Sequence, residues 1–170
     1  MLWHERGGRG DDAYLLLHGL GATGAVWGNV CRELDRRGRG EWLIVDLPGH
    51  GGSEALPQYS VGALASAVAQ GLNSDQPYRI IGHSLGAYVG LALASGWFGV
   101  RIASVLGIGP KIAWSEADLA ATRELARKPA RQPASNPSNL AQRQDYTRGA
   151  ASKTTPGWSA PRHNHRRHFP

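Results

Sequence analysis

The pentapeptide Gly82-His83-Ser84-Leu85-Gly86 has the residue types and spacing most typical of catalysis in this sequence. It joins an apolar run to a segment of small apolar residues with helical spacing. At such a strand-to-helix turn, a serine flanked by glycines two positions away on either side is held in a strained conformation with its hydroxyl exposed. The backbone N–H groups of the following helix favour negative charge that develops nearby. The motif therefore predicts Ser84 as a nucleophile.

A second motif, His18-Gly19-Leu20-Gly21, follows the first strongly apolar run and allows two interpretations. The glycines through Gly24 match the dinucleotide fingerprint G-x-G-x-x-G, and Asp46 ends the next apolar run where a ribose-binding acid is expected. A histidine directly before the first glycine is instead common in the oxyanion loops of hydrolases. No tyrosine is followed four residues later by lysine, the pair that a short-chain dehydrogenase uses. Dinucleotide binding is therefore the less favoured alternative.

The elements that position these motifs alternate regularly between strands and helices. Apolar runs predict strands, and apolar residues three and four positions apart predict helices. The expected strands are Tyr14–His18, Glu41–Leu47, Tyr78–Gly82 and Val100–Ile108. The expected helices are Ala25–Arg37, Ser60–Leu72, Leu85–Trp97 and Ser115–Lys128, the last with Ser115 as N-cap and Asp118 three residues on. The alternation predicts an α/β fold, a partial doubly wound and mostly parallel sheet whose turns at one edge carry the site.

Composition divides the 170 residues into a neutral domain at 1–130 and a basic tail at 131–170. The net charge of +6 lies entirely in the tail, which also holds five of the ten prolines and a single aliphatic residue larger than alanine, Leu140. We expect this tail to be disordered, since it buries too little to offset the entropy of ordering. The lone Cys31 gives neither a disulfide nor a metal-binding spacing, and we expect a small core residue there. Neither a signal peptide nor a membrane span is predicted, so we expect a cytoplasmic protein without membrane partners. We also expect no metal and no cofactor.

The segments LLLHGLGATGAVW, IVDLPGHGGSE and IIGHSLGAYVG together resemble the α/β-hydrolase superfamily, especially its small esterase and lipase-like members. The resemblance covers Leu15 to Pro110. It implies a small-molecule ester or related acyl substrate, Ser84 as nucleophile, and an oxyanion hole formed by the N–H groups of Leu20 and Leu85. The supporting motif residues are His18, Gly19, Gly82, His83 and Gly86. Asp46, His50 and Ser53 resemble the family's structural turn, and we expect them to stabilise a loop.

The resemblance also implies a triad acid and a histidine downstream of the serine, and neither has an evident counterpart. The downstream acids are Glu116, Asp118 and Glu124 in the last predicted helix and Asp145 in the tail; the downstream histidines are His163, His165 and His168, with no strand to position them. We expect the helix at 115–128 to begin a cap, and the chain to be C-terminally truncated or frameshifted near 129–131. The leading hypothesis is a serine hydrolase that forms an acyl-enzyme on Ser84. The alternatives are a catalytically inactive remnant and, less favoured, nucleic-acid binding through the tail.

Overall fold

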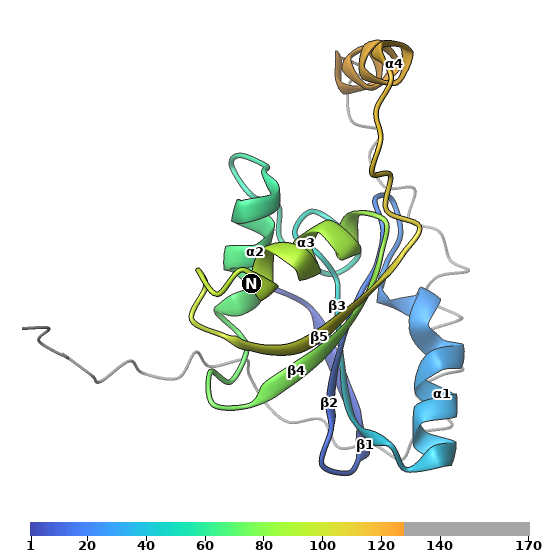
Figure 1. Cartoon of the computed structure of the whole chain (residues 1–170), viewed down its shortest axis with the longest axis vertical. Helices are drawn as coiled ribbons and strands as arrows, with labels where there is room; N and C mark the ends of the chain where they lie inside the picture. The colour runs from blue at the N-terminus through green and yellow to red at the C-terminus, as the bar shows by residue number, and fades with distance from the viewer. Residues whose placement is uncertain (128–170) are drawn as a thin grey trace, which may run out of the picture.

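The structure, a computed structural model, describes residues 1–127 and consists of one five-stranded sheet with helices on both faces (Figure 1). The strand order is β1-β3-β2-β4-β5; β1 runs antiparallel to β3, and the other neighbours are parallel. The strands are β1 His4–Arg9, β2 Ala13–Leu17, β3 Gly40–Val45, β4 Pro77–His83 and β5 Arg101–Ile108. The predicted α/β class and mostly parallel sheet are confirmed. The predicted tail at 131–170 lies outside the described residues.

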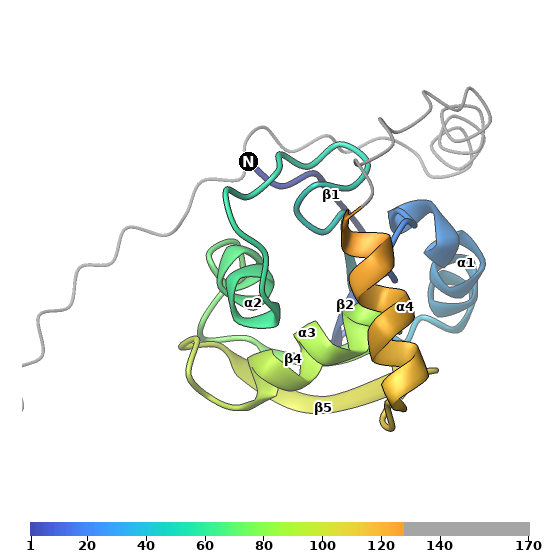
Figure 2. The same ribbon diagram turned by 90° about the horizontal axis from the view of Figure 1, so that it is seen from above.

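The helices cover the two faces unequally. α1 (Gly28–Arg37) packs against β1 and β3 on one face, while α2 (Val61–Ala69) and α3 (Leu85–Ala94) pack together on the other (Figure 2). The single helix predicted over Ala25–Arg37 is split, because a 3-10 turn, η1 (Gly24–Trp27), precedes α1. This leaves the β4–β5 part of the α1 face without a helix from residues 1–127.

Two apolar clusters explain why the central strands are almost continuously apolar. On the side of α2 and α3, a cluster includes Leu15 and Leu17 of β2, both fully buried. On the α1 side, a second cluster includes Leu16, Cys31 and Trp42. Since successive side chains of a strand point to opposite faces, a parallel strand that is covered on both faces needs apolar residues at every position. Cys31 is a buried core residue, as predicted.

Strand β1 was not predicted, because its sequence HERGGR has no apolar alternation. It pairs with β3 through backbone hydrogen bonds from His4↔Val45 to Arg9↔Gly40. Gly7 lies against the Trp42 indole so closely that a Cβ atom on it would come 2.7 Å from Cε2 of that ring. β1 is therefore an edge strand without apolar side chains, and it is held by backbone pairing with β3 and by close contact of Gly7 with the Trp42 ring.

The last described helix, α4 (Glu116–Arg127), stands away from the sheet (Figure 1). Its predicted N-terminus is confirmed: Asp118 N donates to Ser115 Oγ at 3.2 Å, and Ser115 N donates to the Asp118 carboxylate at 3.0 Å. The Lys111 ammonium pairs with the same carboxylate and, together with the Ser115 hydrogen bonds, holds the pKa of Asp118 well below its usual range. No helix within residues 1–127 is both long enough and apolar enough to cross a membrane.

Candidate active site

The turn between β4 and α3 holds Ser84 in a conformation that side chains rarely adopt. Its φ of 48° and ψ of −109° make it the one non-glycine residue with a positive φ in the described part of the chain. Hydrogen bonds hold the turn on both sides: Ser84 N donates to the Ile108 carbonyl of β5 at 2.9 Å, and Ala87 N donates to the Ser84 carbonyl at 3.0 Å. This is the strained strand-to-helix turn that the sequence motif predicts, and the segment Gly82–Gly86 is called the elbow below.

Gly82 and Gly86 are required because the backbone on either side of Ser84 is tightly packed. A Cβ atom on Gly82 would lie 2.5 Å from the Gly86 carbonyl oxygen. A Cβ atom on Gly86 would overlap the Leu17 carbonyl group and lie 2.8 Å from the carbonyl oxygen of His18. Only glycine lets β4, α3 and the end of β2 approach this closely.

The same close approach places the elbow beside the loop that follows β2. Leu17 pairs with Gly82 in the sheet register, so the next residues of both strands leave the same edge. Leu20 lies in the exposed turn closed by the Ala22 N–H bond to the Gly19 carbonyl at 3.2 Å. Leu85 opens α3, where first-turn N–H groups have no intrahelical acceptor. The two predicted oxyanion donors therefore come from adjacent segments at the carboxyl edge of the sheet.

His18 is fully buried beneath this loop, and both of its ring nitrogens are engaged. Leu47 N donates to His18 Nε2 at 2.9 Å, which makes Nε2 an acceptor and places the proton of the neutral ring on Nδ1. Nδ1 then donates to the Gly19 carbonyl at 2.8 Å. His18 consequently ties the start of the oxyanion loop to the end of β3, and it has no nitrogen left to act as a base.

Asp46 fastens two loops at this edge. Its fully buried carboxylate accepts hydrogen bonds from Gly24 N at 2.7 Å and from Gly52 N at 2.9 Å, and its carbonyl accepts from Ser53 Oγ at 2.5 Å. The Trp3 backbone continues the network, since Trp3 N donates to Ser53 Oγ at 2.8 Å. This agrees with the predicted loop-stabilising role. A carboxylate so enclosed is not presented to a ribose, which weighs against the dinucleotide interpretation.

Neither His83 nor His50 forms a hydrogen bond with Ser84. The His83 ring lies against Gly19, where a Cβ atom would come 2.7 Å from His83 Nδ1. The His50 ring packs edge-on against His18, with centroids 5.1 Å apart. Within residues 1–127 no side chain forms a hydrogen bond with the Ser84 hydroxyl, and no three acidic, His or Cys side chains gather to hold a metal ion. His163, His165 and His168 lie outside the described residues.

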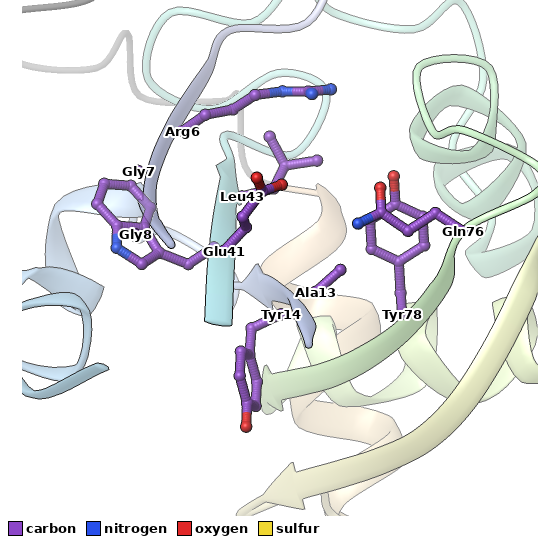
Figure 3. A pocket seen from close by; sticks show the side chains of 10 residues that line it. Arg6, Gly7, Gly8, Ala13, Tyr14, Glu41, Leu43, Gln76 and Tyr78 are labelled. Carbon is purple, nitrogen blue, oxygen red and sulfur yellow. The ribbon is translucent and has the colours of Figure 1, made fainter. Parts of the chain in front are cut away.

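A cavity of about 260 Å³ lies at the amino-terminal ends of the parallel strands, whereas Ser84 follows a carboxyl-terminal end (Figure 3). Its lining includes Ala13, Glu41 and Tyr78, which lie near the amino ends of β2, β3 and β4, together with Arg6 and Gln76. Ser84 follows the carboxyl end of β4, so this cavity is separate from the elbow. Ligands of parallel α/β sheets bind beyond the carboxyl ends of the strands, which favours the elbow as the site.

The fold and elbow agree with a match to a family model described as the alpha/beta hydrolase family, which covers residues 14–170. The chain belongs to this family. The match extends beyond the Leu15–Pro110 stretch that carries the motifs, and it includes residues that the structure does not describe.

Several curated proteins similar to this chain are named as methyl ester esterases, and another is named as a magnesium-chelatase 30 kDa subunit from Rhodobacter capsulatus. It is 38% identical over 88 residues to pimeloyl-[acyl-carrier protein] methyl ester esterase of Chromobacterium violaceum, a match covering 52% of this chain and 33% of that protein. The corresponding protein of Aeromonas hydrophila is 41% identical over 92 residues, covering 53% and 34%. The chain thus spans about a third of the length of the curated relatives it matches.

Solved structures show the same fold. An esterase from a marine microorganism superposes with a TM-score of 0.60 at 19% identity, covering 85% of this chain and 58% of that one. A thermophilic esterase from Thermogutta terrifontis gives a TM-score of 0.61 at 23% identity, covering 84% and 52%. At these identities the comparison establishes the architecture alone.

Proposed function

We propose that this chain carries the nucleophile and oxyanion hole of a serine hydrolase acting on small carboxylic esters. The observation that carries the proposal is the strained backbone of Ser84 between two glycines that admit no side chain. A backbone strain of this kind costs of order 1–3 kcal/mol and persists where function requires it. The resemblance to methyl ester esterases supports an ester as the substrate class.

In the proposed reaction, Ser84 Oγ attacks the ester carbonyl carbon and its proton passes to a base. The N–H groups of Leu20 and Leu85 stabilise the oxyanion of the tetrahedral intermediate. Collapse of the intermediate breaks the ester C–O bond, the alkoxide leaves with a proton as alcohol, and an acyl group stays on Ser84. Water then attacks this acyl-enzyme, releases the carboxylic acid and regenerates the serine.

The rate depends on the base, and residues 1–127 place no imidazole against Ser84. Without a triad histidine, the oxyanion hole and binding alone give roughly 10³- to 10⁴-fold catalysis over water. We therefore expect slow turnover of p-nitrophenyl esters by this chain. An inactive remnant is the alternative, and it predicts no hydrolysis that depends on Ser84.

The test is labelling by a fluorophosphonate probe together with p-nitrophenyl acetate hydrolysis. We expect slow labelling that maps to Ser84 by mass spectrometry and disappears in Ser84→Ala. Ser95→Ala, which removes an exposed hydroxyl near the other end of α3, is the control and should label like the wild type. Equal hydrolysis by wild type and Ser84→Ala would support the remnant. Loss of activity in a His163, His165 and His168 triple alanine variant would instead assign the base to residues 128–170.

A further inference from the structure

Trp3 precedes β1 and extends the pairing of that strand with β3 by one residue. His4 and Val45 are the terminal pair of the ladder, so Trp3 and Asp46 come next on the two strands. Asp46 N donates to the Trp3 carbonyl at 3.0 Å. In the other direction the Ser53 hydroxyl bridges the two residues: it accepts from Trp3 N at 2.8 Å and donates to the Asp46 carbonyl at 2.5 Å. The backbone of Trp3 is thereby fixed against Asp46.

The Trp3 indole lies against two glycines at its opposite ends. A Cβ atom on Gly52 would come 3.0 Å from Trp3 Cγ, in the five-membered ring. A Cβ atom on Gly24 would come 3.3 Å from Trp3 Cζ3, in the six-membered ring. These are the two glycines whose N–H groups donate to the Asp46 carboxylate, at 2.7 Å from Gly24 and 2.9 Å from Gly52. One aromatic side chain thus packs on both donors of one buried carboxylate.

The contact at Gly24 borders the hydrogen bond between this glycine and Asp46. The position of a Cβ atom on Gly24 is equally far, 3.3 Å, from Asp46 Oδ1 and from Trp3 Cζ3, so the carboxylate and the indole share one side of this glycine. The Asp46 side chain is fully buried. A hydrogen bond to a carboxylate is stronger where water is excluded, because the local dielectric constant is low. We therefore expect a shorter side chain at position 3 to admit water to this bond and weaken it.

The importance of that bond follows from how the oxyanion loop, residues 19–24, is held. Its first end is fixed by the buried His18 ring, and its last end is fixed by the Gly24 hydrogen bond to Asp46. Between these ends the loop is open to solvent, with the Leu20 residue 73% exposed. Packing of the Leu20 side chain therefore contributes little to the position of the loop, which depends on its two ends.

We propose that Trp3 is a positioning residue for the oxyanion hole. Its indole holds Gly24 against Asp46, and through that end of the loop it sets where the Leu20 N–H group lies relative to Ser84. Trp3 acts through Gly24 and is not itself a catalytic residue. Its effect on catalysis rests on the function proposed above, whereas its effect on the loop does not.

Hydrogen–deuterium exchange of the full chain, measured by mass spectrometry, tests the effect on the loop. The sharpest variant is Trp3→Phe, because the smaller ring keeps an aromatic contact at Gly52 but falls short of Gly24. We expect peptides that cover residues 19–24 to exchange about fivefold faster, as when one hydrogen bond is weakened. Peptides from α3 should keep the wild-type rate. Trp97→Phe, at a residue that is 89% exposed, is the matched control and should change neither rate.

The same measurement separates positioning of the loop from simple filling of the core. Exposed loops exchange by local opening, whereas core elements such as α3 exchange by opening of the whole domain. If Trp3 only stabilised the domain, Trp3→Phe would accelerate exchange in α3 and not in the loop. Any result in which the loop is not accelerated more than α3 overturns the proposal. Trp3→Ala should accelerate the loop further if it folds, and Trp3→Phe keeps the test decisive if it does not.

Hydrolysis of p-nitrophenyl acetate tests the effect on catalysis. Oxyanion donors act in the transition state, so a displaced Leu20 N–H should lower kcat and leave KM unchanged. Loss of one donor costs roughly 10²- to 10³-fold in kcat, and we expect about a tenfold decrease in Trp3→Phe, where the donor is displaced and not lost. A wild-type kcat in this variant would overturn the catalytic role of Trp3. Equal hydrolysis by wild type and Ser84→Ala would instead contradict the proposed function, and the exchange rates would still decide whether Trp3 positions the loop.

Discussion

The α-carbon of Gly86 lies against the carbonyl group of Leu17 with no space for a side chain between them. We expect Gly86→Ala to destabilise the fold by about 2 kcal/mol, because overpacking costs about 1–3 kcal/mol and the obstacle is backbone. Urea unfolding measures this. Gly62→Ala is the control: the nearest atom to its Cβ is Ser60 Oγ at 3.9 Å, and alanine in a helix is more stable than glycine by about 0.5–1 kcal/mol. Equal effects of the two variants would show that the contact does not matter.

The positive φ of Ser84 should be measurable as strain. Glycine adopts this backbone conformation without a Cβ penalty, so we expect Ser84→Gly to be more stable than Ser84→Ala by about 1 kcal/mol. Thermal unfolding of the two variants gives the comparison, and both should lose fluorophosphonate labelling. Identical melting temperatures would contradict a strained elbow.

Asp46 should be among the most sensitive polar residues of the domain. Asp46→Ala leaves the N–H groups of Gly24 and Gly52 without their acceptor, and each unsatisfied buried group costs about 1–3 kcal/mol. We expect a loss of about 3 kcal/mol in the free energy of unfolding. Asp46→Asn keeps one acceptor oxygen and should lose less. A wild-type urea midpoint for Asp46→Ala would refute this role.

Stability should fall at mildly acidic pH partly through His4. Burial lowers the pKa of His4 from its usual 6.5, opposed by its hydrogen bond to the Leu2 carbonyl and aided by the Arg6 charge. Below pH 6.5 the unfolded chain therefore binds a proton that the folded chain does not, so stability declines as pH falls until the folded pKa is passed. We expect His4→Gln to flatten this decline in urea midpoints measured between pH 7.5 and 5.5. An unchanged slope would assign the decline to other groups.

Sequence patterns predicted the parts of this molecule whose physics is local. The strands around Leu16 and Ile80 are apolar at consecutive positions because both faces of the sheet are covered there. The turn at Ser84 could be predicted from the spacing of its glycines, which the tight packing there requires. β1 gave no such signal, because edge pairing is made by backbone groups that any residue carries. The break before α1 was missed because Ala25–Arg37 keeps helical apolar spacing through the 3-10 turn.

The candidate site, like the fold, could be predicted from the sequence only where its structure depends on local residues. Ser84 and the adjacent glycines could be predicted, and so could a loop-stabilising Asp46. The specific partners of Asp46 and His18 could not, because Gly52 and Leu47 reach them across loops whose course depends on tertiary packing. Trp3 was missed altogether, since its contacts with Ser53 join segments fifty residues apart.

The pairing of β2 with β4 has a consequence for the order in which the chain folds. Leu17 and Gly82 are neighbours in the sheet although they lie 65 positions apart in the sequence, and β3 occupies the other side of β2. Contacts of high sequence separation slow folding, because a long loop must close before they form. A nascent chain that ends before β4 already contains the loop after His18 but not the surface against which that loop rests. The nucleophile and the donors that would serve it are therefore acquired together, in a late and non-local step.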